Sequence, residues 1–211
     1  MRESRPVSRA GAPAVVTAVW EALQGSKVVS SIVLGGSRAR GTATELSDWD
    51  LYVEGDPHGM VAEIPALIAS VGPLAAFWEP LSQEAGYMVV MDGPIKVDVF
   101  PIGASRRIQP PWVLSADSLA SIDCHFWDWT LWLGGKRLRG ERQLVADELA
   151  TMHRFLLAPL GVASAPTSLD EAVASYHRAR AHAMDTLGVV VPQELGRQVS
   201  EALRRTGSSV D

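Results

Sequence analysis

The sequence has little cysteine and no long apolar run, and each lack narrows the class of protein. Its 211 residues include one cysteine, Cys124, so no disulfide can form within the chain. No segment is apolar over the roughly 20 residues that a membrane-spanning helix needs. The apolar stretch Ala14–Trp20 superficially resembles a secretion signal, but it is short and ends at Glu21, so it predicts an ordinary first helix. We therefore expect a cytoplasmic protein with no membrane partner.

Positive charge is also scarce. The 19 lysines and arginines are outnumbered by 24 aspartates and glutamates, which gives a formal net charge of -5. A protein that grips a nucleic-acid backbone usually carries a basic surface. The composition therefore argues against a nucleic-acid partner and favours a small acceptor molecule, a cationic one included.

Several familiar motifs are missing as well. The chain contains neither G-x-x-x-x-G-K-[ST] nor G-x-G-x-x-G, which excludes the two commonest phosphate-binding loops. Its histidines form no ligand spacing with Cys124, so a structural zinc site is not expected.

What the chain does have is a short glycine turn after a buried strand. Residues 28–34 are mostly apolar and β-branched, and Gly35 and Gly36 end the run, so the segment predicts a buried strand. A turn without side chains lets a phosphate group approach the backbone N–H groups closely. Ser37 adds a hydroxyl and an N–H group, so the turn predicts a phosphate-binding site.

Two carboxylates follow the turn. Asp48 and Asp50 are two residues apart in a segment that continues as an apolar strand, so their side chains share one face while Trp49, Leu51 and Val53 share the other. Neighbouring carboxylates repel each other unless a cation lies between them. Hard oxygen ligands at this spacing suit Mg²⁺, which also binds phosphate oxygens and water.

A third carboxylate lies in the strictly alternating segment 95–100, which follows a turn at Asp92-Gly93. Asp98 faces away from the apolar residues of that segment. An aspartate in a β-branched run is disfavoured and is costly when buried, so it needs a compensating partner. We expect that partner to be a metal shared with Asp48 and Asp50.

These elements together resemble the nucleotidyltransferases of the DNA polymerase beta superfamily. The resemblance rests on a strand ending in Gly35-Gly36-Ser37, an Arg40-Gly41 pair, Ser47-Asp48-Trp49-Asp50-Leu51 and the later Val97-Asp98-Val99, in that order. Within the superfamily the chain is most similar to small adenylyltransferases that modify antibiotics such as aminoglycosides and lincosamides. The motifs cover residues 28–103.

The resemblance implies a reaction and a set of site residues. Two Mg²⁺ ions would bind Asp48, Asp50 and Asp98, and a nucleoside monophosphate, usually AMP from ATP, would pass to a hydroxyl of a small acceptor with release of pyrophosphate. The triphosphate would contact Gly35, Gly36, Ser37 and Arg40. Glu79 is our choice as general base, with Asp98 and Asp123 as alternatives.

The order of the predicted helices and strands indicates an α+β fold, in which a mixed β-sheet core with helices packed on one side precedes a C-terminal helical region. We expect a catalytic domain over residues 1–108 and a helical acceptor and triphosphate domain over 109–211, after the break at Gln109-Pro110-Pro111. Strands are predicted at 28–34, 48–53, 74–79, 86–91 and 95–100, and helices at 14–24, 58–70, 116–133, 141–157, 168–187 and 192–205.

The helix predicted over 116–133 is rich in tryptophan. Trp129, Trp132 and Lys136 share a face by their spacing, and Trp127 is displaced from it. One interpretation is an aromatic wall beside a substrate, with Lys136 reaching the β- and γ-phosphates. The other is that the tryptophans pack the helical region and that Lys136 is a solvated cation near a helix break at Gly134-Gly135.

Two other functions stay open. The chain could be the nucleotidyltransferase of a toxin–antitoxin pair that modifies a partner protein, although such modules tend to lack a long region after the catalytic core. It could also be a non-catalytic nucleotide-binding protein that keeps the fold. The presence of all three aspartates together with Gly36 and Ser37 argues against loss of activity.

Overall fold

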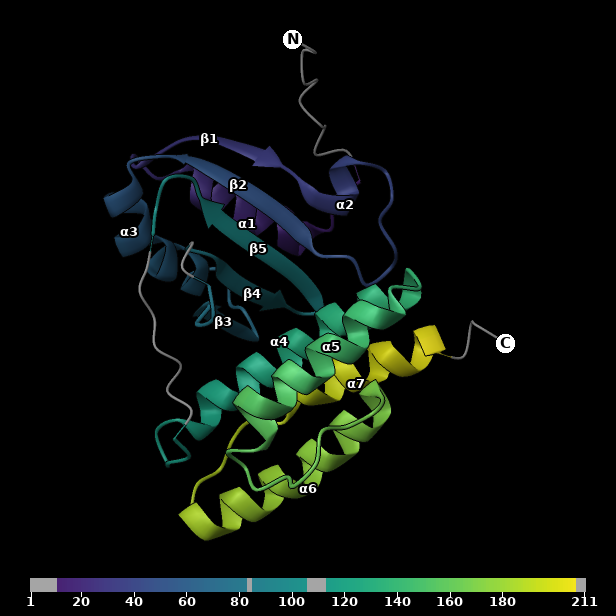
Figure 1. The fold of residues 1–211 in the computed structure, drawn as a ribbon. Coiled ribbons are helices and arrows are strands. Elements are labelled where there is room, and N and C mark those ends of the chain that lie inside the picture. Colours follow the sequence, from purple (N-terminus) through teal and green to yellow (C-terminus); the bar gives the residue numbers. More distant parts are fainter. Residues whose placement is uncertain (1–10, 83–84, 106–112, 208–211) are drawn as a thin grey trace. The chain divides into compact units, whose positions relative to one another are not determined.

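The computed structural model describes residues 11–82, 85–105 and 113–207. The chain divides into two compact units, residues 1–43 with 47–109 and residues 44–46 with 110–211. The first unit holds a β-sheet with helices and the second is helical (Figure 1). The predicted α+β fold class is therefore confirmed. The break predicted at 109–111 lies outside the described residues.

The sheet of the first unit is mixed. Its strand order is β1-β2-β5-β4-β3, in which β2 and β5 run parallel and the other neighbours run antiparallel. The strands are β1 Val29–Leu34, β2 Trp49–Gly55, β3 Ala75–Trp78, β4 Tyr87–Met91 and β5 Ile95–Pro101. The five strands lie within two residues of their predicted bounds. The prediction that the first of them is buried is wrong, because β1 is an edge strand with no fully buried residue, whereas β4 is buried along its whole length.

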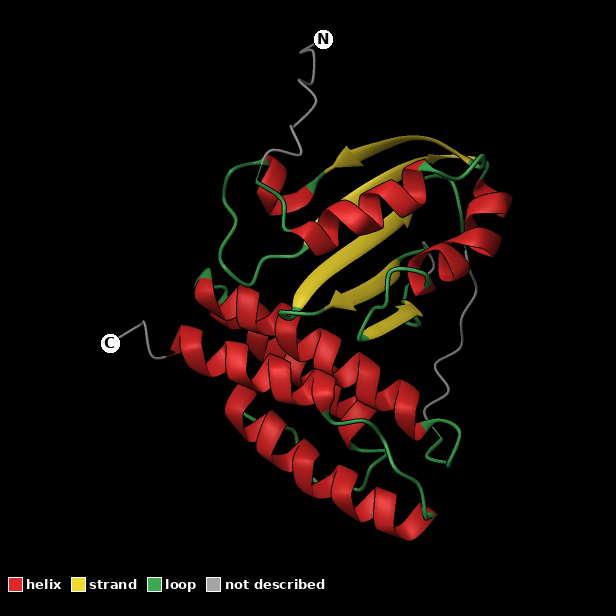
Figure 2. Ribbon diagram, turned by 180° about the vertical axis from the view of Figure 1, so that it is seen from behind, coloured by secondary structure: helices red, strands yellow, loops and turns green. Residues whose placement is uncertain are grey.

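Two helices, α1 Ala14–Gln24 and α3 Pro57–Ala69, lie across that face of the sheet (Figure 2). Each presents apolar residues three or four positions apart, which puts them on one side of the helix. The helix α3 begins where the carboxylate of Asp56 accepts a hydrogen bond from the N–H of His58, with Pro57 in the first turn. The buried core consists of Val16, Val19, Leu23, Leu51, Val53, Met60, Ile64, Ile68, Tyr87, Val89, Met91, Val97 and Val99.

Because these helices cover one face, the polar residues of β2 and β5 lie on the other. Leu51 and Val53 of β2 and Val97 and Val99 of β5 belong to the core, so the residues between them point away from it. The prediction of helices packed on one side of the sheet is confirmed. It is this arrangement that separates the carboxylates from the apolar core.

The second unit contains four long helices at about the predicted places. They are α4 Leu119–Leu138, α5 Arg142–Met152, α6 Leu169–Leu187 and α7 Glu194–Gly207, and a π-helical turn, η1 His153–Leu157, follows α5. The helix α4 packs against α5, α6 and α7. Among the described residues, no helix is both long enough and apolar enough to cross a membrane.

The helix α4 continues for five residues beyond the predicted end at 133, so the break expected at Gly134-Gly135 is wrong. The two glycines serve close packing instead. A Cβ atom on Gly134 would lie 2.4 Å from Leu203 Cδ2, and one on Gly135 would lie 3.0 Å from the carbonyl oxygen of Leu46. Glycine destabilises the interior of a helix, but a larger residue at these two positions would clash with the neighbouring segments.

Aromatic residues fill the interior of the helical unit. The rings of Phe126 and Tyr176 stack with centroids 3.7 Å apart, and Trp127 meets Tyr176 edge-on. A Cβ atom on Gly196 of α7 would lie 2.6 Å from the Trp127 ring, so this glycine makes room for the indole. Trp127 is therefore a core residue of this unit.

A buried charged group ties α4 to α6. The carboxylate Oδ1 of Asp123 is 2.6 Å from Nε of Arg180 and accepts a hydrogen bond of 2.5 Å from the hydroxyl of Tyr176. Arg180 also donates to the carbonyl oxygens of Val191 and Pro192. Burial raises the pKa of Asp123, while Tyr176 and Arg180 act in the opposite direction. The carboxylate and the guanidinium are thus paired with each other and bonded to further polar groups, which offsets the cost of burying both charges.

Candidate active site

The three predicted aspartates lie together on the polar face of the sheet. The parallel register of β2 and β5 pairs Asp50 with Asp98, and Asp48 immediately precedes β2. Each residue offers a carboxylate oxygen, and these oxygens lie within 4.8 Å of one another. Asp98 is buried, whereas Asp48 and Asp50 are partly exposed. The structure therefore brings together the carboxylates whose common face the sequence indicated.

The glycine turn is next to this cluster. The helix α2 Gly36–Ala39 follows β1, and the N–H of Gly35 donates a hydrogen bond of 2.8 Å to the carbonyl oxygen of Asp50. Gly36 has a φ of +60°, which disfavours any other residue. A Cβ atom at this position would lie 1.6 Å from Oδ2 of Asp50. The absence of a side chain at Gly36 thus leaves room for a carboxylate of the cluster.

This corrects the reason that the sequence analysis gave for the two glycines. A Cβ atom on Gly35 would lie 2.2 Å from the ring of Tyr52, so the space beside Gly35 is taken by an aromatic side chain. The space beside Gly36 is taken by Asp50. Both glycines are needed because β2 side chains approach the turn, whether or not a phosphate binds there. Their contact with a triphosphate stays a prediction.

Ser37 carries a hydroxyl that has no internal partner. The residue is 7% exposed, and its Oγ forms no hydrogen bond with any described residue, while its carbonyl oxygen accepts a bond from the N–H of Thr42. A buried hydroxyl without a partner is unfavourable unless a ligand or water satisfies it. This observation supports the predicted role of Ser37 as a phosphate contact.

Lys96 is a site residue that the sequence analysis missed. Its Nζ is 2.7 Å from Oδ1 of Asp98, and both side chains are buried. The geometry is that of an ion pair rather than of an aligned hydrogen bond. The expectation that a metal alone compensates Asp98 was therefore incomplete. The alternation that places Asp98 on the polar face also places Lys96 there, two residues earlier, and this signal was available in the sequence.

Arg38 is the second residue that the sequence analysis missed. Its Nε donates to the carbonyl oxygens of Ser47 and Asp48 at 3.1 and 3.0 Å, and its guanidinium lies 4.2 Å from the centroid of the Trp49 ring. Burial lowers the pKa of Arg38, and the charges of Asp48 and Asp50 oppose this effect. Arg38 thus fixes the backbone from which the first two carboxylates project.

Arg40, the arginine that the resemblance favoured, is exposed at the C-terminal end of α2. Arg38 is therefore the one of the two that the structure ties to the aspartates. The predicted contact of Arg40 with the triphosphate stays a prediction.

The structure does not bring Glu79 to the aspartates. Glu79 follows β3, an edge strand, and its carboxylate accepts a hydrogen bond of 2.7 Å from the N–H of Leu81. Since β4 lies between β3 and β5, the two outer strands are about 10 Å apart. The alternative base Asp123 is held by Arg180 within the helical unit. Of the three possible bases, Asp98 is the one in the carboxylate cluster.

Lys136 lies near the end of α4 and has partners within the helical unit. Its Nζ is 3.7 Å from Oε2 of Glu141 and 4.7 Å from the centroid of the Trp132 ring. Arg139 also pairs with Glu141, at 2.6 Å, and its hydrogen bond is the main cause that lowers the pKa of Glu141. The predicted contact of Lys136 with the β- and γ-phosphates stays a prediction.

The donor set fits a hard divalent cation. Three carboxylates with oxygens within 4.8 Å of one another provide ligands of the kind that Mg²⁺ prefers, and they repel one another without it. The adjacent Ser37 hydroxyl offers a donor to a phosphate group. The cluster can therefore hold a cation beside an anionic substrate.

Comparison with known proteins agrees with this geometry. Residues 16–80 match the family model described as "Nucleotidyltransferase domain". This range holds the glycine turn, Asp48 and Asp50, so the chain contains a nucleotidyltransferase domain. The prediction that the chain is a nucleotidyltransferase is confirmed by this match.

A solved structure is also similar to this chain. An aminoglycoside 6-adenyltransferase from Bacillus subtilis aligns over 91% of this chain and 96% of that chain, with 11% sequence identity and a TM-score of 0.36. The search of curated proteins found no match.

The contact between Gly36 and Asp50 leads to a prediction. We expect Gly36→Ala to weaken Mn²⁺ binding by about tenfold or more, because the new methyl group displaces the Asp50 carboxylate. Gly41→Ala is the matched control, since Gly41 has a φ of +70° but no atom within 4 Å of its Cβ position. Both variants should lose about 1–2 kcal/mol of stability from the left-handed backbone.

Titration of both variants with Mn²⁺, followed by electron paramagnetic resonance, measures the difference, and urea unfolding checks the common loss of stability. Equal Mn²⁺ affinities in the two variants would show that the Asp50 contact does not govern the metal site.

Proposed function

We propose that the protein transfers a nucleoside monophosphate, AMP from ATP in the first instance, to a hydroxyl group of a small acceptor, with Mg²⁺ as cofactor and pyrophosphate as the second product. The observation that carries the proposal is the cluster of Asp48, Asp50 and Asp98 within a nucleotidyltransferase domain. A cluster of this kind, next to a buried hydroxyl without a partner, suits a charged triphosphate bound through a cation.

Each residue has a part in this reaction. Asp48, Asp50 and Asp98 would hold Mg²⁺, which when bound neutralises phosphate charge and lowers the pKa of the acceptor hydroxyl. Ser37 would donate a hydrogen bond to a phosphate oxygen. Arg38 keeps the backbone of Ser47 and Asp48 in place. Glycines 35 and 36, Arg40 and Lys136 complete the proposed triphosphate contacts.

The transfer forms one bond at the α-phosphorus of the nucleotide and breaks another. The acceptor oxygen forms a bond to the α-phosphorus, and the bond from that phosphorus to the β-phosphate oxygen breaks to release pyrophosphate. The proton of the acceptor hydroxyl passes to a base. We assign this base to Asp98, because its carboxylate belongs to the cluster that would hold the metal.

The acceptor class comes from the sequence. Its resemblance to antibiotic adenylyltransferases suggests hydroxylated amines such as aminoglycosides and lincosamides, and the net charge of -5 suits a cationic acceptor. Antibiotic resistance is therefore the physiological role that we propose to test first.

A label-transfer assay tests the proposal. The purified chain is incubated with each α-³²P-labelled nucleoside triphosphate, Mg²⁺ and a panel of aminoglycosides and lincosamides, and we expect labelled acceptor and pyrophosphate in equal amounts. EDTA should abolish both products. Label on a protein band in place of the small acceptor would instead favour the partner-modifying alternative. If the chain binds ATP in the presence of Mg²⁺ but releases no pyrophosphate with a small acceptor or with a protein, a non-catalytic nucleotide-binding protein is favoured.

A further inference from the structure

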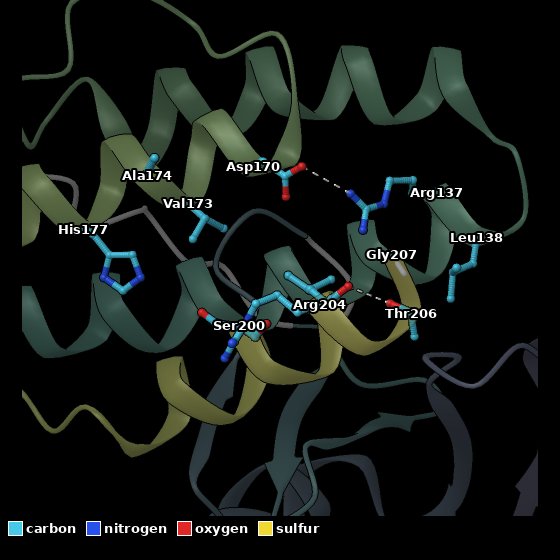
Figure 3. A pocket seen from close by; sticks show the side chains of 11 residues that line it. Arg137, Leu138, Asp170, Val173, Ala174, His177, Ser200, Arg204, Thr206 and Gly207 are labelled. Atoms are coloured by element: carbon cyan, nitrogen blue, oxygen red, sulfur yellow. Dashed lines mark hydrogen bonds and ion pairs between the residues drawn. The ribbon is translucent and has the colours of Figure 1, made fainter. Parts of the chain in front are cut away.

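The helical unit contains a pocket formed by its own helices. It lies among the end of α4, the first half of α6 and the second half of α7, and its volume is about 990 Å³ (Figure 3). This volume is in the range of sites that hold small molecules.

Positive charge prevails in the lining. Arg137 and Arg204 come from different helices, α4 and α7, and Asp170 is the one acidic residue among the described residues of the lining. Nη1 of Arg137 is 3.9 Å from Oδ2 of Asp170, whose side chain is 88% exposed. An ion pair this long and this exposed contributes little. Arg137 can therefore engage an anionic ligand at small cost.

The lining also offers a hydroxyl and an apolar wall. Oγ of Ser200 is buried and has no hydrogen-bond partner among the described residues, so a polar ligand atom that reached it would relieve an unfavourable state. The hydroxyl of Thr206, by contrast, is bonded to the carbonyl oxygens of Ala202 and Leu203. Leu138, Val173 and Leu203 provide the apolar surface.

His177 adds an uncharged ring at the other end of the pocket. Its pKa is lowered by burial first and by the charge of Arg180 second, while Asp123 acts in the opposite direction. The ring is therefore mostly neutral at pH 7, and it packs against Trp127 with centroids 5.3 Å apart. It extends the apolar wall rather than adding charge.

We propose that this pocket is a binding site for an organic anion that carries one carboxylate or phosphate group on an apolar body. The anionic group pairs with Arg137, Arg204 adds a second positive charge to the lining beside Ser200, and the body packs on Leu138, Val173 and Leu203. Guanidinium groups suit both oxyanions because their N–H groups can bind two oxygens at once. The same charges disfavour a cationic amine, so this is a site for a ligand other than a cationic acceptor.

The test uses two anionic probes and a cation of similar shape. Binding of 3-phenylpropionate, phenyl phosphate and 3-phenylpropylamine to the full chain is measured by isothermal titration calorimetry, without nucleotide or Mg²⁺. We expect at least one anion to bind with a Kd of about 1 mM or below and the amine to bind at least about tenfold more weakly. The ratio of the two anions distinguishes a carboxylate site from a phosphate site.

Two variants locate the binding. Arg137→Gln should weaken anion binding at least about tenfold and Arg204→Gln by a smaller factor, whereas Arg197→Gln, on the exposed side of α7 and outside the lining, should leave it unchanged. Thermal melts confirm that all three variants are folded. The proposal is overturned if no probe binds, or if the anions and the amine bind equally well. It is also overturned if the two lining variants lose no more affinity than Arg197→Gln does. Because nucleotide and Mg²⁺ are absent, these outcomes are independent of the transferase activity.

Discussion

Asp50→Asn is expected to lower the rate of nucleotidyl transfer by about a thousandfold or more while the chain stays folded. Loss of one of the three carboxylates removes a metal ligand and with it several kcal/mol of transition-state stabilisation, and about 4 kcal/mol corresponds to a thousandfold. The metal-free variant should be as stable as the parent or slightly more stable, because repulsion among the carboxylates is relieved.

Asp50 is a better choice for this experiment than Asp98. Replacing Asp98 would remove the carboxylate that lies 2.7 Å from the buried Nζ of Lys96, and breaking a buried ion pair destabilises the fold. If an Asp98 variant lost activity, the missing metal ligand and the unfolding of the chain would therefore be indistinguishable as causes.

The assay compares Asp50→Asn with Asp185→Asn, the same chemical change at an exposed position of α6. Transfer of label from α-³²P ATP gives the rate, and thermal melts with and without Mg²⁺ give the stability. We expect Mg²⁺ to raise the melting temperature of the parent and of Asp185→Asn but not of Asp50→Asn. A large loss of stability in metal-free Asp50→Asn would mean that Asp50 is a structural residue, and an unchanged rate would remove it from the site.

The second large effect is expected in the helical unit, where Asp123→Ala should lower the free energy of unfolding by about 3–5 kcal/mol. The substitution leaves the buried Arg180 without its carboxylate and the Tyr176 hydroxyl without its acceptor. Arg180 keeps its bonds to two carbonyl oxygens, which hold the guanidinium in place and prevent it from moving into water.

A double variant separates the loss of a partner from the loss of packing. Asp123→Leu combined with Arg180→Met replaces both charges by apolar side chains, and it should recover part of the stability because no charge is left buried, while the Tyr176 hydroxyl still lacks its acceptor. Urea unfolding of the full chain measures both. A double variant as unstable as Asp123→Ala would show that packing volume, and not charge pairing, sets the cost. A variant that stays stable but loses turnover would restore Asp123 as a possible base.

Part of the site follows from the sequence because the side-chain period of a strand is two. Asp48 and Asp50 share a face with each other, and Asp98 is opposite the apolar residues of its own segment; these are local facts that any extended conformation imposes. The same reasoning would have found Lys96, which is two residues before Asp98 and therefore points to the same face of the strand. It was missed because a lysine in a strand is usually taken to be solvated, whereas this one is 4% exposed.

The sequence by itself thus determined the strands, the helices, the α+β class and the common face of the carboxylates, since all of these follow from short-range periodicity. Only the tertiary structure decided which strands are neighbours. The parallel pairing of β2 with β5 sets Asp50 beside Asp98, residues 48 positions apart, and the order of the sheet leaves Glu79 two strands away from Asp98 and three from Asp50. Close approach of distant segments also explains Gly36 beside Asp50 and the continuation of α4 through Gly134 and Gly135. Such contacts depend on how separate elements pack, and a local pattern carries no information about the side chain that will fill the space beside a glycine.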